Sequence, residues 1–233
     1  MNPLKFLLKK FLLVIGALAL CTAANAAVVL VTTSDPGYYN DSIGNSLNDT
    51  NGGNTPAGYF PTSDDSSVSF PLAPDLSTAS GALGNWLTDP LNLNANWSFE
   101  ASIPNSWAVG TEVAVMYQFN TLGATNVVAR FGVDNGIFAW LDGVYLGGAR
   151  AGGGVALGEH TFNVGDLASG THFLQLLLED HGAVNGYAVE ITADTFIPGP
   201  PPSVSLPEPG TLVLLAIGIA GIGYQRRRKN TTV

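Results

Sequence analysis

The stretch Phe131-Gly-Val-Asp-Asn-Gly-Ile-Phe-Ala-Trp-Leu-Asp-Gly-Val-Tyr145 decides the fold. It contains two short apolar runs, 137–141 and 144–146, separated by Asp142-Gly143. This dipeptide readily takes the positive φ angles of a two-residue hairpin turn. A second turn signal, Asp134-Asn135-Gly136, separates the run 137–141 from the apolar stretch 127–133. The stretch therefore predicts three strands joined by two tight hairpins.

The same pattern of short apolar runs and turn residues extends on both sides of this stretch. We expect further strands at 28–33, 97–103, 112–119, 160–164, 172–178 and 187–192. The segment 34–74 is rich in Asn, Asp, Ser, Gly and Pro, and we expect long loops there with one or two short strands, packed onto the body by their aromatic residues. Many short strands without helical periodicity predict an all-β fold, an antiparallel β-sandwich.

The hairpin at 131–145 is similar to the D-[DN]-G … W/Y-[LV]-[DN]-G hairpin of PA14-like and galactose-binding-like jelly-roll domains. Downstream, Gly165–Asp180 resembles the L-x-x-G-x-H-x-L strand entry of the same folds. The resemblance covers about residues 95–195 and implies a jelly-roll-like sandwich. It implies no particular function, because this fold carries binding modules, adhesins and structural domains alike.

The N-terminal segment has the three parts of a secretory signal peptide. Lys5, Lys9 and Lys10 form a basic region, and an apolar region follows at 11–20. Ala24 and Ala26 form an A-x-A cleavage site, so we expect residues 1–26 to be removed after passage through the Sec translocon and Ala27 to start the mature chain. The only cysteine, Cys21, leaves with this segment, which removes disulfide and thiol chemistry from the mature chain.

The C-terminal segment 206–233 has an equally distinct order. Pro207, Glu208 and Pro209 precede an uncharged apolar run at 211–224, which is followed by Arg226, Arg227, Arg228 and Lys229. This order resembles the PEP-CTERM sorting signal. The resemblance implies recognition by an exosortase, an integral-membrane cysteine protease, and a role linked to exopolysaccharide and biofilm. A Pro-rich stalk at 198–205 joins the signal to the body.

The length of the apolar run limits what this tail can do in a membrane. Fourteen residues make about 21 Å of helix, which is shorter than the hydrocarbon core of about 30 Å. The basic cluster keeps its end in the cytoplasm. We therefore expect a short hydrophobic helix that holds the protein at the inner membrane transiently, before it reaches the cell surface or the extracellular space. A plain C-terminal anchor is the alternative.

The body, residues 27–197, is strongly acidic and long enough for a single domain. It contains 17 of the 18 acidic residues and only two of the nine basic residues, Arg130 and Arg150, which leaves a net charge of −15. Nucleic acid is excluded as a partner, because binding it requires cations that neutralise phosphates. An acidic surface suits an exported protein that binds neutral sugars or cations, and it also suits simple solubility.

Several body residues are candidates for ligand or metal binding. Trp140, Asp134, Asn135 and Asp142 are candidate ligand-binding residues, since tryptophans stack on sugar rings and the acids lie at turns. Asp134, Glu179 and Asp180 are candidate Ca²⁺ ligands, because Ca²⁺ prefers carboxylate oxygens. Plain turn formation is the alternative for the Asp-Gly pairs, and burial in the core is the alternative for Trp140.

The sequence gives no catalytic signature. It has no G-x-S-x-G motif and no histidine spacing of the H-E-x-x-H kind, so no catalytic residue and no bound cofactor is assigned. The interpretation is a non-enzymatic, exported carbohydrate-binding or adhesive protein with polysaccharide as a partner. A purely structural envelope or matrix protein is the first alternative. An extracellular hydrolase is the second, and it would need two opposed carboxylates in a cleft.

Overall fold

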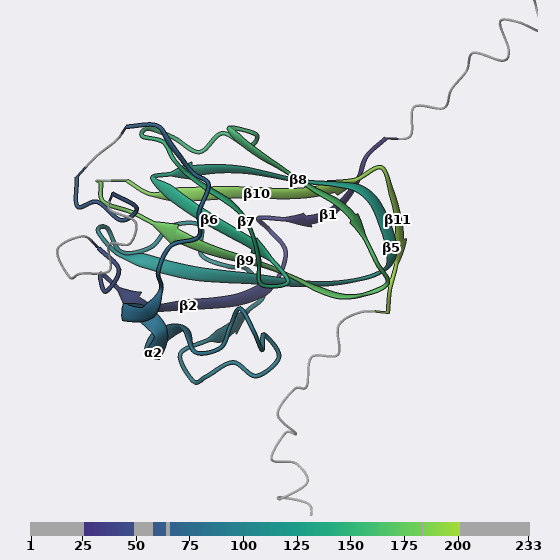
Figure 1. Ribbon diagram of the computed structural model, residues 1–233, viewed down its shortest axis with the longest axis horizontal. Helices are drawn as coiled ribbons and strands as arrows, with labels where there is room; N and C mark the ends of the chain where they lie inside the picture. The colour runs from purple at the N-terminus through teal and green to yellow at the C-terminus, as the bar shows by residue number, and fades with distance from the viewer. Residues whose placement is uncertain (1–25, 49–57, 64–65, 183, 201–233) are drawn as a thin grey trace, which may run out of the picture. The chain divides into compact units, whose positions relative to one another are not determined.

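The strand β5 (Glu112–Asp134) organises the molecule in this computed structural model, which describes residues 26–48, 58–63, 66–182 and 184–200. The eleven strands of the described residues join one antiparallel sheet, and β5 belongs to both of the layers into which this sheet curls (Figure 1). The bend in β5 falls where Gly123 and Asn126 have φ angles of 141° and 50°. The expected all-β antiparallel sandwich is confirmed.

The first layer forms around the N-terminal half of β5. In this half β5 pairs with β2 (Gly37–Gly44) on one side and with β9 (Gly170–Glu179) on the other. The layer continues from β9 through β6 (Gly136–Leu141) and β7 (Val144–Arg150) to β3 (Val68–Phe70). At the other edge β4 (Ser98–Glu100) pairs with β2.

The second layer forms around the C-terminal half of β5. Here β5 pairs with β10 (Gly186–Ala193) and β11 (Thr195–Pro198) on one side, and with β8 (His160–Leu167) on the other. The N-terminal strand β1 (Val28–Thr32) lies outside β10. Because a single strand supplies the centre of both layers, the two layers cannot separate without breaking β5.

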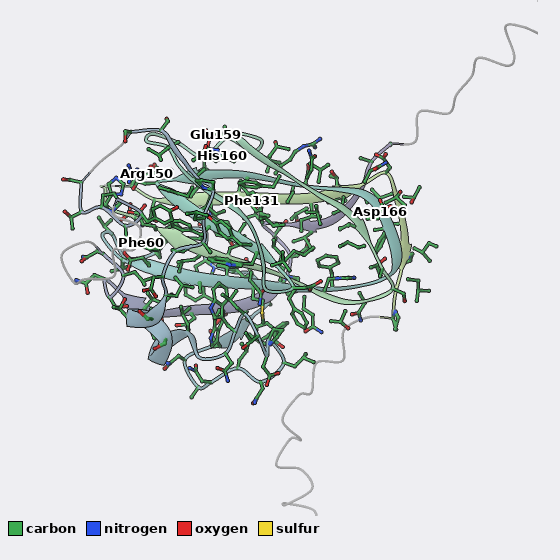
Figure 2. All side chains as sticks on the ribbon, in the orientation of Figure 1. Phe60, Phe131, Arg150, Glu159, His160 and Asp166 are labelled. Atoms are coloured by element: carbon green, nitrogen blue, oxygen red, sulfur yellow. The ribbon has the colours of Figure 1, made fainter. Side chains whose placement is uncertain are left out.

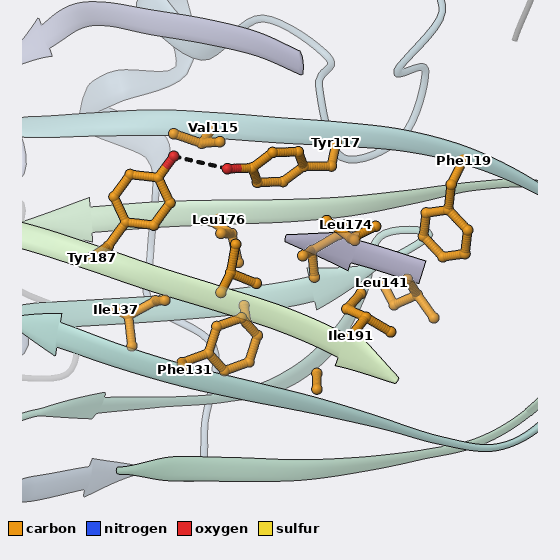
Figure 3. Close-up of a cluster of buried hydrophobic side chains, with 14 of the residues drawn as sticks. Val115, Tyr117, Phe119, Phe131, Ile137, Leu141, Leu174, Leu176, Tyr187 and Ile191 are labelled. Carbon is orange, nitrogen blue, oxygen red and sulfur yellow. Dashed lines mark hydrogen bonds between the residues drawn. The ribbon is translucent and has the colours of Figure 1, made fainter. Parts of the chain in front are cut away.

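The main core fills the space between the layers, as alternation along each strand requires. Val115 and Tyr117 of β5 face Leu176 of β9 and Tyr187 of β10, and all four are buried. The hydroxyl groups of Tyr117 and Tyr187 lie 2.8 Å apart and satisfy each other within this apolar cluster (Figure 3). A buried hydroxyl without a partner would cost about 1–3 kcal/mol.

A second core lies on the outer face of the first layer. It packs Phe138 and Trp140 of β6 against Phe60 and Trp86 from the segment between β2 and β4. That segment contains the 3₁₀ turn η2 (Ser77–Ala79) and the one-turn helix α2 (Ser80–Leu83), which lies beside β2 (Figure 1). We call residues 45–97 of this segment, so far as they are described, the cover.

The strand expectations were right in position and wrong in two connections. The runs 112–119 and 127–133 form one strand, because the chain stays extended through its bend at Gly123. Asp134-Asn135-Gly136 is no hairpin: β6 pairs with β9 and β7, so this turn carries the chain from the second layer to the first. The Asp142-Gly143 hairpin is confirmed, with φ angles of 51° and 76°.

Expectations about the two ends of the chain fall largely outside the described residues. The chain divides into two units, Met1–Pro200 and Pro201–Val233, and the second is not described. The apolar run 211–224, the sorting residues 207–209, the basic cluster 226–229 and Ala24 all lie outside the described ranges. Within those ranges no helix combines the length and the apolar character that crossing a membrane requires.

Candidate functional site

The structure separates the predicted ligand residues into two groups at opposite ends of β6. Asp134, Asn135, Glu179 and Asp180 come together where β5 and β9 end and β6 begins. Trp140 and Asp142 lie at the other end of β6. The six candidates therefore do not form one site.

Asp142 forms a structural link at the β6–β7 hairpin. One oxygen of its carboxylate, Oδ1, accepts the backbone N–H of Phe173 at 2.8 Å, and the other, Oδ2, lies 2.7 Å from Nδ1 of His172. The second ring nitrogen of His172 faces the carbonyl oxygen of Ala168 at 3.0 Å. Both oxygens of Asp142 are thus engaged by the protein, which supports the turn interpretation over the ligand one.

Trp140 is buried, which contradicts its assignment to a ligand surface. Only 3% of it is exposed, and its ring meets Trp86 edge to face with centroids 5.6 Å apart. Alternation along β6 puts Trp140 and Phe138 on one face and Ile137 on the other, and each face packs into a different core. Burial in the core, the alternative for Trp140, is therefore correct, although the residue lies on the outer face of the first layer. The cover buries it.

The acidic group at the start of β6 is held by hydrogen bonds from the protein. Asp180 accepts the backbone N–H groups of Gly110 at 2.6 Å and of Gly182 at 3.2 Å. Asp134 accepts the side-chain amide of Asn135 at 2.9 Å. Asp134, Glu179 and Asp180 do not converge as ion ligands, and the described residues contain no group of three or more His, Cys, Asp or Glu side chains placed to hold a metal. The donors fit an internal network better than a Ca²⁺ site.

Three residues of this network escaped the sequence assignment. Glu112, Arg150 and His181 join Glu179 there: Nδ1 of His181 lies 2.6 Å from the Glu179 carboxylate, and the Arg150 charge acts on it. Burial raises the pKa of Glu179, while His181 and Arg150 lower it. No spacing in the sequence links Glu112 and Arg150 to the other two residues, because the four come from three separate segments.

Glu112 is the most perturbed acid of the network. It is 1% exposed, and burial, followed by the nearby Glu179 carboxylate, raises its pKa to about 8. Backbone N–H groups, including that of Leu47 in the cover, offset part of the effect. Arg150 also binds the cover, since its guanidinium donates to the carbonyl oxygens of Gly58 at 2.9 Å and Ser66 at 3.3 Å. The network therefore joins the cover to the sandwich.

A groove at the open edge of the sandwich is the better candidate for ligand binding. It has a volume of about 310 Å³ and lies where β3 and β7 of the first layer meet the start of β8 in the second. Its lining combines apolar and polar residues: Ser69, Phe70, Pro71, Leu146, Gly147, Gly148, Ala149, Glu159, His160, Thr161 and Phe162. A second hollow, of about 330 Å³ in the cover, is lined by leucine, serine, threonine and other residues without a titratable side chain.

The aromatic wall of the groove is fixed by packing. The ring of Phe162 lies 5.6 Å from that of Phe131 in the main core. It also lies directly over Gly147, where a Cβ atom would come within 2.3 Å of the Phe162 ring. Gly147 has a φ of 150°, so both the space and the backbone conformation require glycine. The half-buried Phe162 is therefore held in one orientation beside the groove.

The polar wall of the groove is formed by Glu159, His160 and Thr161. Glu159 and His160 lie together at one edge of the sandwich, far from Asp166 (Figure 2). Nε2 of His160 is buried and has no hydrogen-bond partner among the described residues. Burial lowers the pKa of His160, although the Glu159 carboxylate opposes this. The histidine is thus neutral at pH 7, and its Nε2 is enclosed by the protein, so a ligand in the groove can contact only the remaining surface of the ring.

Comparison with known proteins identifies the sorting signal. The described residues form an antiparallel β-sandwich module. Residues 205–229 match the PEP-CTERM protein-sorting motif, so the chain carries the export and exosortase-processing signal that its tail indicated. Comparison with curated protein sequences gave no significant match.

Solved structures similar to this chain include two PA14 domains and a glycosidase. The PA14 domain of the MpAFP antifreeze protein is 14% identical with a TM-score of 0.32, and the alignment covers 76% of this chain and 92% of that domain. The PA14 sugar-binding domain from an RTX adhesin is 18% identical with a TM-score of 0.28, covering 58% and 70%. A β-glucuronidase from Ruminococcus gnavus is 9% identical with a TM-score of 0.41, covering 72% and 30%.

These likenesses identify neither a ligand nor an activity, since every one of the TM-scores lies below 0.5. The chain also spans less than half of the length of three of these proteins. It covers 46% of an anti-sigma factor domain-containing protein, and 31% and 30% of two β-glucuronidases.

Proposed function

We propose that this exported protein is a non-enzymatic carbohydrate-binding module of the cell surface or extracellular matrix, and that it binds through the groove between β3, β7 and β8. The signal peptide would direct it through the Sec translocon. The C-terminal segment would hold it transiently at the inner membrane until an exosortase removes the tail. The link of such tails to exopolysaccharide makes a biofilm polysaccharide the proposed partner.

The observation that carries the proposal is the combination of a fixed aromatic ring with hydrogen-bonding groups in one groove. A sugar ring has an apolar C–H face and a rim of hydroxyl groups. Phe162 offers a surface for the face, and the hydroxyl groups of Thr161 and Ser69 offer partners for the rim. The volume of about 310 Å³ lies at the lower end of the range for small-ligand sites.

The same groove supports binding over hydrolysis. Most glycosidases place two carboxyl groups on opposite sides of the scissile bond. Only one of the residues that line the groove, Glu159, carries a carboxylate. The acids of the network at the start of β6 are buried and engaged with the protein. A purely structural role in the matrix is the alternative, and it predicts no saturable binding of polysaccharide.

The test is to fill the groove without disturbing the sandwich. Thr161 is exposed on the edge strand β8 and lines the groove, whereas Asn163 is equally exposed two residues further along the same face. We expect Thr161→Trp to lower the affinity for polysaccharide from the producing cells at least about tenfold, and Asn163→Trp to leave it unchanged. Both should keep the wild-type unfolding midpoint.

The readout is affinity electrophoresis or titration calorimetry with the purified polysaccharide. Equal binding by Thr161→Trp and wild type would place the sugar site elsewhere. Failure of every form to bind would favour the structural alternative.

A further inference from the structure

Neither of the two arginines of the body lines the groove. Arg130 and Arg150 are the only basic residues of the body apart from histidine. Arg130 is the cross-strand neighbour of Thr161, but its guanidinium is paired with Glu190 of the next strand, β10, at 3.2 Å. Arg150 is 2% exposed and binds the cover. A carboxylated sugar in the groove would therefore lose water without gaining a counter-charge.

The rim of the groove instead carries a negative charge without a counter-charge. The Glu159 side chain is exposed and forms no ion pair or hydrogen bond with the residues that the structure describes. Its neighbour His160 is neutral at pH 7, because burial lowers the pKa of its ring. Glu159 also belongs to a body with a net charge of −15, so the surroundings favour a cation at this position.

We infer that the groove selects its glycan by charge: it binds amine-bearing sugar chains, with a protonated amine facing Glu159, and excludes chains of uronic acids. The inference rests on the proposed carbohydrate-binding function and specifies its substrate class. Phe162 supplies the contact that every pyranose shares, and Glu159 supplies the discrimination. An N-acetylated chain of the same backbone has the shape but not the charge, and it therefore binds more weakly than the amine form.

The experiment compares three hexamers on the full-length protein at about pH 6: β-1,4-linked glucosamine, its N-acetylated form, and a uronic acid hexamer. Calorimetry at low salt should give the amine hexamer an affinity about threefold or more above that of the N-acetylated hexamer, with no binding of the uronate. The preference should disappear in about 1 M salt, where the screening length falls to about 3 Å.

Two carboxylate variants isolate the role of Glu159. Glu159→Gln should bring the ratio of the two affinities to about one. Glu100→Gln removes the same charge from β4, outside the groove, and should keep the wild-type ratio.

Each outcome separates the two proposals. Uronate binding equal to that of the amine, or a preference that survives in Glu159→Gln, overturns the inference and leaves carbohydrate binding intact. Absence of binding of all three hexamers and of the cell polysaccharide overturns both.

Discussion

Replacing Glu112 by glutamine should make the protein more stable, and increasingly so as the pH rises. Glu112 is 1% exposed, and its pKa is raised from 4.5 to about 8, mainly by burial. Because the folded state holds this proton more tightly than the unfolded state, the contribution to stability is complete below about pH 4.5. It is lost as the pH rises through about 8, when a buried charge must be maintained.

The size of the effect follows from the difference between the two pKa values. One pKa unit corresponds to about 1.4 kcal/mol, so ionising Glu112 in the folded state costs on the order of 5 kcal/mol in total. Between pH 5 and pH 9 the free energy of unfolding of the wild type should fall by about 4 kcal/mol relative to Glu112→Gln. The glutamine resembles the protonated acid and can still accept the N–H of Leu47.

Urea unfolding followed by tryptophan fluorescence at about pH 5, 7 and 9 measures this difference. Glu159→Gln is the control, because it removes one negative charge from an exposed position and so reports the general effect of net charge. Parallel pH profiles for wild type and Glu112→Gln would refute the reasoning. They would mean that the Glu112 carboxyl reaches water or an additional donor in solution.

Three further predictions concern packing and processing. Trp140→Ala should lower the free energy of unfolding by about 3–5 kcal/mol in urea denaturation, because it opens a cavity beneath the cover; a change below about 1 kcal/mol would contradict its burial. Gly147→Ala should also destabilise the protein, because the new Cβ would meet the Phe162 ring at 2.3 Å. The control Gly81→Ala in α2 meets no atom within 4 Å and should be neutral or stabilising by up to about 1 kcal/mol. Equal thermal midpoints for the two variants would argue against the tight contact at Gly147. Glu208→Ala should leave the C-terminal tail uncut, seen as a larger intact mass by mass spectrometry; secreted wild type that still ends at Val233 would contradict processing.

The sequence predicted the strands well, because strand positions depend on local patterns. The Asp142-Gly143 turn and the alternation that sets Phe138 and Trp140 opposite Ile137 are properties of a few consecutive residues. Such local patterns do not determine which strands pair with one another. The turn at Asp134-Asn135-Gly136 was therefore placed correctly, but its role in joining the two layers could not be read from composition.

The candidate site was less predictable, because it depends on contacts between distant segments. The sequence could show which face of its strand carries Trp140, but not whether that face is exposed, because the burial of Trp140 depends on Phe60 and Trp86 in the cover. Glu112 and Arg150 became part of the network only because the start of β5 lies near the ends of β7 and β9. The groove escaped notice for the same reason, as its walls combine β3 with β7 and β8, which lie far from β3 in the sequence.

The shared strand β5 also determines when the protein can fold. Its partners extend from Tyr38 in β2 to Pro198 in β11, and β1 pairs Val28 with Ala193. Folds dominated by such distant pairings form slowly, in milliseconds to seconds. The first layer needs β9 and the second needs β10 and β11, so neither layer can close before the C-terminal strands of the body are available. In the proposed export through a translocation channel, the chain would therefore reach the outer side of the membrane before it folds, and this topology would suit a protein that crosses as an extended chain.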